Sequence, residues 1–241
     1  MPDFKTAISA AACFLVASVT SFASGDLVLS SHSFEASTAG TGNAPAEMEF
    51  TGTFGDQDST FFGISSTAPL TGSLSYVVDL GNNGGSSGFG GSFSGVNHNG
   101  LAGTLTTSSR YTISAWFRED AADPFTGGGE VNVHLEFYDI SNALLFRTDS
   151  AGIHEKLNSS MISTAYQQLT HNYTLNNAVH ISDPALVNRV AAVVTASNGG
   201  NTGDGTVYID DFQFSTIPEP SSLLMLGLFV GAGAARRTRS K

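Results

Sequence analysis

The side chains best suited to bind a ligand lie in two short stretches where apolar and polar residues alternate. In 111–118, Trp116 and Arg118 fall on the polar side, and Trp116 is the only tryptophan of the chain. In 131–137, Asn132, His134 and Glu136 share the polar side. A sugar stacks its apolar face on an aromatic ring and needs planar polar groups for its hydroxyls. These five residues are therefore the candidate ligand-binding set, and a glycan is the candidate ligand.

Two alternatives stay open for this set. A one-residue bulge would reverse the faces of the strand and turn Trp116 into the core. The stretches 111–118 and 131–137 need not share one surface, although their polar sides could do so. His134 by itself is more typical of a solvated strand residue than of a ligand.

Catalysis finds little support in the same residues. Glu130 and Glu136 are six positions apart on one predicted strand, about 20 Å from each other and too far apart for either glycosidase geometry. The six histidines are scattered, and no His-Glu-x-x-His motif or Ser-His-Asp context is present. Cys13, the only cysteine, lies near the N-terminus, where it offers the body no thiol chemistry. We therefore predict that the protein is not an enzyme, with a glycan-active hydrolase or lyase as the third alternative.

The charge of the chain excludes one class of partner. The formal net charge is -11, with 21 acidic and 10 basic residues. The ends, 1–23 and 217–241, hold half of the bases but only two of the acids, so the stretch 24–216 carries 19 acids and 5 bases, a net charge of -14. Such a surface repels phosphate, and we predict no nucleic-acid partner.

The strands that must position the candidate residues follow from period-two patterning. Alternation with one polar face is typical of antiparallel sheets that pack on a second sheet, and turn residues recur about every ten positions. We predict an all-β fold, an antiparallel β-sandwich of the jelly-roll kind, over residues 24–216. The clearest strands are expected at 73–80, 111–118, 131–137, 167–175, 189–196 and 206–214. The glycine-rich segment 81–103 is expected to be a long loop, because it ends in no Lys-Ser/Thr and precedes no helix.

Both ends of the chain are predicted to be targeting signals. Residues 1–23 have the pattern of a secretory signal peptide: Lys5, an apolar helical stretch over 7–19, and small residues at Ser21 and Ala23. Residues 217–241 contain Pro218-Glu219-Pro220, a short hydrophobic helix over 223–235, and a basic cluster that includes Arg236 and Arg237. The hydrophobic stretch would be about 20 Å long as a helix, short of a bilayer core of ~30 Å. This order is that of a processed sorting signal with transient membrane contact, in which the basic cluster stays on the cytoplasmic side.

The C-terminal segment closely resembles the PEP-CTERM sorting signal of Gram-negative bacteria. The resemblance rests on Pro218-Glu219-Pro220, the glycine-bearing hydrophobic segment and the arginines, in that order. It implies recognition by exosortase, a membrane transpeptidase-like enzyme, in a host that makes exopolysaccharide. It therefore implies a protein exported to the cell surface or the extracellular space.

The body resembles the galactose-binding-like jelly rolls, including carbohydrate-binding modules. The motifs that carry this resemblance are spread over the body: Phe34-Glu35, 111–116, Glu136-Phe137-Tyr138-Asp139, Tyr166-Gln167-Gln168 and 207–212. The chain departs from the family pattern at His32-Ser33, where Asn-Gly is usual, and at Tyr166, where tryptophan is usual. The resemblance implies a structural calcium ion that joins the first strand to the last, with Glu35 and Asp210 at the ligand positions; calcium prefers carboxylate and other hard oxygens. Its alternative is that Glu35 is simply exposed and Asp210 borders a turn.

Together these features predict an exported, exosortase-sorted protein of the cell surface or extracellular matrix. Its β-sandwich is predicted to be non-catalytic and to bind polysaccharide. The alternative is a structural matrix or coat protein without a defined ligand.

Overall fold

In the computed structural model the described strands belong to the unit Leu27–Thr216. Within the chain the structure describes residues 27–46, 53–55, 62–80, 85–92, 110–175, 180–181, 183–197 and 203–217, a few of them by backbone alone. The predicted signal peptide and nearly all of the predicted sorting signal lie outside the described residues.

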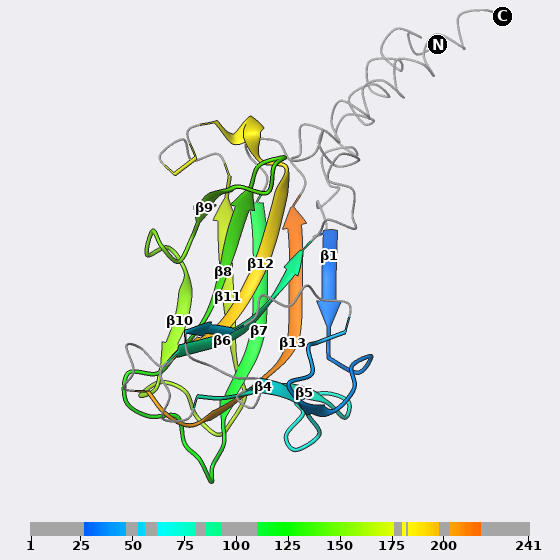
Figure 1. The fold of residues 1–241 in the computed structure, drawn as a ribbon, viewed down its shortest axis with the longest axis vertical. Coiled ribbons are helices and arrows are strands. Elements are labelled where there is room, and N and C mark those ends of the chain that lie inside the picture. The colour runs from blue at the N-terminus through cyan, green and yellow to red at the C-terminus, as the bar shows by residue number, and fades with distance from the viewer. Residues whose placement is uncertain are drawn as a thin grey trace, which may run out of the picture. The chain divides into compact units, whose positions relative to one another are not determined.

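Two antiparallel sheets make up the unit (Figure 1). The seven-stranded sheet, sheet A, runs in the order β11 (Gln167–Thr174), β7 (Arg110–Glu119), β13 (Thr206–Ile217), β5 (Ser75–Asp79), β4 (Phe62–Ser65) and β2 (Gly40–Thr41), and β1 (Leu27–His32) also pairs with β13. The six-stranded sheet, sheet B, runs in the order β10 (Glu155–Asn158), β8 (Glu130–Tyr138), β12 (Arg189–Ser197), β6 (Gly85–Ser92) and β3 (Thr53–Gly55), and β9 (Leu144–Arg147) pairs with β8. In the described part of the chain the single helical segment is the 3-10 turn η3 (Pro184–Leu186). The predicted all-β sandwich is confirmed, and so are its six clearest strands.

The core lies between the sheets and follows the predicted alternation. On β8 the residues Val131, Val133, Leu135 and Phe137 are all buried and belong to one hydrophobic cluster. The opposite wall comes from β7 and β13, where Tyr111 and Phe214 stack with ring centroids 6.0 Å apart. Each of these strands turns its remaining side chains outward, so the outer faces carry the polar residues.

The prediction of a loop over the glycine-rich segment 81–103 is wrong for residues 85–92, and the other residues of the segment lie outside the described residues. Residues 85–92 form β6, which pairs with β12 on one side and with β3 on the other. A ladder needs only backbone N–H and C=O groups, so glycine can complete it when the neighbouring strand supplies the packing. Here β12 supplies it, since Val193 and Thr195 lie opposite Gly90 and Gly88.

A histidine on β11 faces the core. His171 is 5% exposed, opposite Ile113 of β7, and its Nε2 has no hydrogen-bond partner in the described structure. Burial, assisted by the nearby His154 and His134, lowers the pKa of His171 to about 4. The fold therefore holds this imidazole neutral, although its ordinary pKa is 6.5.

This histidine makes the fold sensitive to acid. Because the folded pKa lies below the unfolded value, its stabilising contribution is complete above pH 6.5 and is lost as the pH falls toward 4. Between pH 7 and pH 4.5 we expect the wild-type free energy of unfolding to fall by about 2 kcal/mol more than that of His171→Leu. Urea denaturation at several pH values measures this. Asn172→Leu, on the outward side of the same strand, should keep the wild-type pH profile, and parallel profiles for wild type and His171→Leu would show that His171 does not cause the loss.

Candidate functional site

The five predicted ligand-binding residues lie on two different surfaces. Trp116 and Arg118 are on the outer face of sheet A, because β7 belongs to that sheet. Asn132, His134 and Glu136 are on the outer face of sheet B, because the next strand, β8, crosses to it. The two groups therefore do not form one site.

The β8 residues are bonded to each other rather than presented to solvent. His134 is 1% exposed and Asn132 6% exposed, and His134 Nδ1 lies 2.8 Å from Asn132 Oδ1. The other ring nitrogen, Nε2, lies 3.5 Å from Glu136 Oε1 and 3.8 Å from Asp149 Oδ2.

An arginine from β9 completes this network. Arg147 Nε lies 3.2 Å from Glu136 Oε1, and Arg147 Nη2 lies 2.7 Å from Asp149 Oδ2. Burial by itself would raise the pKa of Glu136, but hydrogen bonds from His134 and Tyr138 and the charges of His134 and Arg147 outweigh it and lower that pKa. The pKa of Asp149 is lowered in the same way, against its burial, by the charges of His134 and Arg147. Both carboxylates are thus held ionised, and the network ties β8 to β9. A ligand-binding role for Asn132, His134 and Glu136 stays a prediction.

The outer face of sheet A holds an arginine between two tyrosines. Arg118 Cζ lies 5.8 Å from the ring centroid of Tyr166 and 5.4 Å from that of Tyr208. The Tyr208 hydroxyl donates to Asp120 Oδ2 at 2.7 Å. Burial and this hydrogen bond raise the pKa of Tyr208 to about 12, and the same bond, with a backbone N–H from Ala122, lowers the pKa of Asp120. Tyr208 is therefore neutral, and the guanidinium of Arg118 lies near the rings of Tyr166 and Tyr208.

Trp116 lies two residues before Arg118 on the same outer face. It is partly buried, whereas its neighbours Ala115 and Phe117 are fully buried in the core. Gln168 of β11 lies opposite it in the sheet. The alternation of inward and outward side chains on β7 is the predicted one, without a bulge that reverses it, so Trp116 does not belong to the core.

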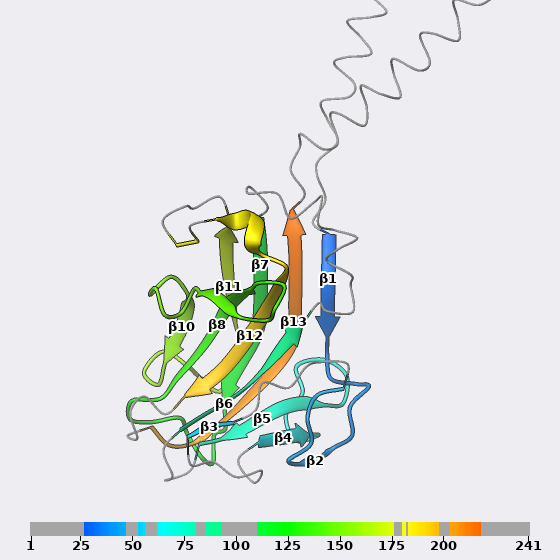
Figure 2. The ribbon, with the colours of Figure 1, turned by 45° about the horizontal axis from the view of Figure 1, so that its top comes forward.

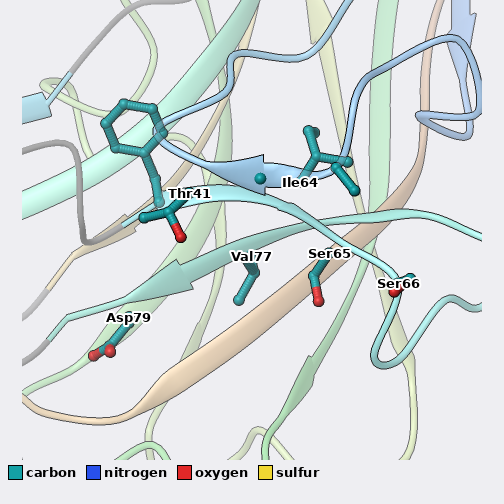
Figure 3. Close-up of a pocket in the computed structure, with 9 residues that line it drawn as sticks. Thr41, Ile64, Ser65, Ser66, Val77 and Asp79 are labelled. Carbon is teal, nitrogen blue, oxygen red and sulfur yellow. The ribbon is translucent and has the colours of Figure 1, made fainter.

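A pocket of about 270 Å³ lies farther along the same face, over β2, β4 and β5. Its lining consists of Ala39, Gly40, Thr41, Phe62, Ile64, Ser65, Ser66, Val77 and Asp79. In Figure 3, Val77 lies in the middle of the pocket, with Asp79 toward one end and Ser65 and Ser66 toward the other. The lining therefore combines an aliphatic floor, several hydroxyls and a single charged group, the carboxylate of Asp79.

The pocket and the arginine cluster lie in one row across sheet A. Val77 of β5 is the register partner of Tyr208 of β13, and Gly63 and Thr41 continue the row on β4 and β2. Sequence reasoning missed Asp79 and Tyr208 as site residues. Each stands in a recognisable alternating stretch, but nothing in the local pattern reveals that β5 pairs with β13, about 130 residues away along the chain.

The predicted calcium ligands hold the loop that leads from the pocket to β5. Asp210 is fully buried, and its Oδ2 accepts N–H groups of Leu70 and Thr71 at 2.7 and 3.3 Å. Glu35 Oε1 accepts the N–H groups of Ser73 and Leu74, both at 2.8 Å. Burial raises the pKa of Asp210 to about 6, although its backbone hydrogen bonds act against this.

Backbone N–H groups thus occupy one oxygen of Glu35 and both oxygens of Asp210. The two predicted ligands both bind the 70–74 loop through its backbone N–H groups. Among the described residues no three His, Cys, Asp or Glu side chains are grouped so that they could hold a metal. Calcium binding stays a prediction. In the same part of the chain no helix is long and apolar enough to cross a membrane.

Fold and site together define a β-sandwich whose sheet A carries a small, hydroxyl-lined pocket beside an aromatic and arginine cluster. Comparison with known proteins identifies a sorting motif C-terminal to this domain. Residues 216–240 match the family model described as the PEP-CTERM protein-sorting motif, which confirms the motif predicted from Pro218-Glu219-Pro220 and the arginines. No curated protein matches the chain.

Several solved structures share the fold at low sequence identity. The CBM22-1 xylan-binding domain of Xyn10C from Paenibacillus barcinonensis is 13% identical, with a TM-score of 0.43, and the match covers 82% of this chain and 99% of that one. The C-terminal family 22 carbohydrate-binding module of Xyn10B from Clostridium thermocellum is 13% identical, with a TM-score of 0.41 and coverage of 78% and 92%. The Stig cyclase Fisc from Fischerella sp. TAU is also 13% identical, with a TM-score of 0.49 and coverage of 80% and 99%. The similar structures thus include carbohydrate-binding modules, the class that the sequence resembles, and an enzyme.

Proposed function

We propose that this protein is exported, processed by exosortase at its C-terminal sorting motif, and binds a neutral polysaccharide at the cell surface through the outer face of sheet A. The sorting motif supports the destination. The carbohydrate-binding modules among the similar structures agree with the ligand class, and the geometry of the pocket carries the proposal.

The pocket lining has the chemistry that one sugar residue needs. Thr41, Ser65 and Ser66 offer hydroxyls, the Asp79 carboxylate can accept a hydrogen bond from a sugar hydroxyl, and Val77 offers apolar surface. Ligand pockets typically combine such an apolar lining with a few polar groups that set orientation. Because the lining contains no Lys or Arg, and the body carries a strong negative charge, a uronic acid would be repelled. A neutral glycan is therefore the favoured ligand.

The sugar residues that follow the one in the pocket would lie along sheet A toward β7. The row from Val77 through Tyr208 leads to Arg118, and Trp116 lies beside it on the outer face. A partly exposed indole can stack on a second sugar, and the guanidinium of Arg118 can donate to its hydroxyls. This part of the proposal keeps Trp116 and Arg118 from the predicted set and adds Asp79.

A non-catalytic role agrees with the state of the carboxylates on β8. Glu130 is paired with Lys156 at 2.8 Å, and Glu136 is engaged by His134 and Arg147. Neither is placed opposite the other across a cleft, as a glycosidase pair requires. Asp79 lines the pocket as its only carboxylate, so an acid and base pair is missing from the lining as described.

Affinity electrophoresis in gels that contain neutral or uronate-rich polysaccharides tests this proposal. We expect retardation by a neutral polysaccharide such as a xylan or a β-glucan, and none by a polyuronate. Asp79→Ala and Trp116→Ala should each raise the Kd about tenfold or more, since each removes a charged hydrogen bond or a stacking surface. The matched control is Glu155→Ala, which removes an exposed carboxylate on β10 of the other sheet, and this variant should bind as wild type.

Two results would contradict the proposal. A folded protein that no polysaccharide retards would favour the structural matrix or coat role instead. Turnover of a polysaccharide would show that the protein is an enzyme.

A further inference from the structure

Strand β11 forms one edge of sheet A, and its outer edge has no partner strand in the described part of the chain. It pairs with β7 over its whole length, Gln167 to Thr174, without a register shift. Figure 2 shows it beside β7, with β13 and β1 on the other side of that strand. Its inward residues Leu169, His171 and Tyr173 are 5–7% exposed, whereas those of β7 are fully buried, as expected at an edge.

The terminal strands of the two sheets other than β11 are protected in the described structure, and β11 is not. Proteins shield sheet edges with short strands, charged side chains, prolines or bulges. Strands β2 and β3 have two and three residues, β9 and β10 have four residues each and contain Arg147 or Lys156, and β1 is interrupted by a register shift. Strand β11 has eight residues, QQLTHNYT, with none of these devices. An edge of this kind is a template for another strand.

The charge pattern indicates which strand can approach. Two copies of a chain with a net charge of -11 repel each other over most of their surfaces. The stretch 157–182 contains no Asp, Glu, Lys or Arg, and β11 lies in its middle. This edge is therefore a place where a second copy of the chain can come close without opposing charge.

Unsatisfied polar atoms gather on the same strand. Six buried side-chain atoms in the described structure lack a hydrogen-bond partner, and three of them are Gln167 Oε1, His171 Nε2 and Tyr173 Oη. A buried polar group without a partner is costly, so a rotation of the Gln167 and Tyr173 side chains toward a second copy at this edge would be favourable. Gln167 Oε1 is an acceptor and the Tyr173 hydroxyl is a donor.

We propose that two copies of this chain associate through antiparallel pairing of their β11 strands about a two-fold axis at Thr170. In this register Gln167 lies opposite Tyr173 of the second copy, so an acceptor and a donor that lack partners can bond once both side chains rotate toward the edge. Gln168 lies opposite Asn172, and Leu169 opposite His171, which keeps inward residues on the inner side and outward residues on the outer side. Thr170 lies opposite itself. The pairing joins two seven-stranded sheets into one, and it does not depend on polysaccharide binding.

Charge variants at the axis test the association and its register. Thr170 is exposed on the outer face, so Thr170→Lys and Thr170→Asp should leave the fold intact. In sedimentation velocity of the full-length protein, from micromolar to millimolar concentration, we expect wild type to form dimers. Each variant should raise the dimer Kd about fivefold or more at low salt, because like charges would face each other across the axis. An equal mixture of the two variants should regain the dimer, since lysine then faces aspartate.

The control separates this edge from the rest of the molecule. Ala151→Lys adds the same charge at an exposed turn of the other sheet and should dimerise as wild type. A wild type that stays monomeric throughout, or dimers that neither Thr170 variant weakens, would overturn the proposal. Dimers weakened by both variants but not restored by mixing them would overturn the axis at Thr170.

Discussion

Gly63→Ala should destabilise the protein by about 3 kcal/mol and destroy the pocket. Gly63 lies on β4 between Thr41 of β2 and Val77 of β5. A Cβ at this position would collide with the backbone carbonyl oxygen of Gly40 and lie 2.9 Å from Thr41 Cα. Both contacts are with backbone, which cannot rotate away, so β2 would be displaced from the sheet and take one wall of the pocket with it. Urea denaturation measures the loss of stability, and affinity electrophoresis measures the loss of binding.

Gly152→Ala is the matched control for this substitution. Gly152 has φ +70° in a turn, and a Cβ there would meet nothing within 4 Å. The same change should therefore cost only about 1 kcal/mol, the strain of a left-handed conformation, and leave binding unchanged. Equal effects of the two substitutions would show that β2 yields to the added methyl group.

Asp210→Ala should cost about 3 kcal/mol of unfolding free energy. The buried carboxylate accepts three backbone N–H groups, from Leu70, Thr71 and Asp211, and alanine leaves all three without an acceptor. The loop that contains Ser66 would then loosen, so limited proteolysis should cut it faster than in wild type. Denaturation by urea gives the magnitude.

Asp211→Asn is the control for Asp210→Ala, and the effect of Ca²⁺ on the Tm is a second measurement on the same variants. Asp211 makes one exposed side-chain bond, from Thr71 Oγ1, so Asp211→Asn should cost less than about 1 kcal/mol. If Glu35 and Asp210 bind calcium as the family resemblance implies, Ca²⁺ should raise the Tm of wild type and not that of Asp210→Ala. A Tm that responds to calcium equally in both proteins would remove Asp210 from the site.

Much of the fold could be predicted because its signal is local. In a strand, successive side chains point to opposite faces, so the alternation of 111–118 and 131–137 assigns both the secondary structure and the side to which Trp116 or His134 points. The structure agrees at both strands. The short strands β2, β3, β9 and β10 were not predicted, because two to four residues are too few to show a period. Strand β6 was missed for another reason: its glycines carry no side chains that could show one.

The composition of the candidate site could not be predicted in the same way. Trp116 and His134 lie on polar sides of successive strands, yet they belong to opposite outer faces of the sandwich, because β7 and β8 are in different sheets. The His134 network also depends on Arg147 and Asp149, which a turn brings back beside β8. The pocket needs β5 next to β4 and β13, contacts between segments far apart in sequence.

The sequence by itself therefore determined the address and the elements: a C-terminal sorting motif, an acidic body unsuited to nucleic acid, and strands with one polar side each. These follow from residue types at short spacing, where chemistry and period are both local. Only the tertiary structure decided which strands are neighbours, and hence that Asp79, Tyr208 and Arg118 share one face while Asn132 and Glu136 do not. Strand order depends on how the whole core packs most favourably, and no single stretch of the chain carries that information.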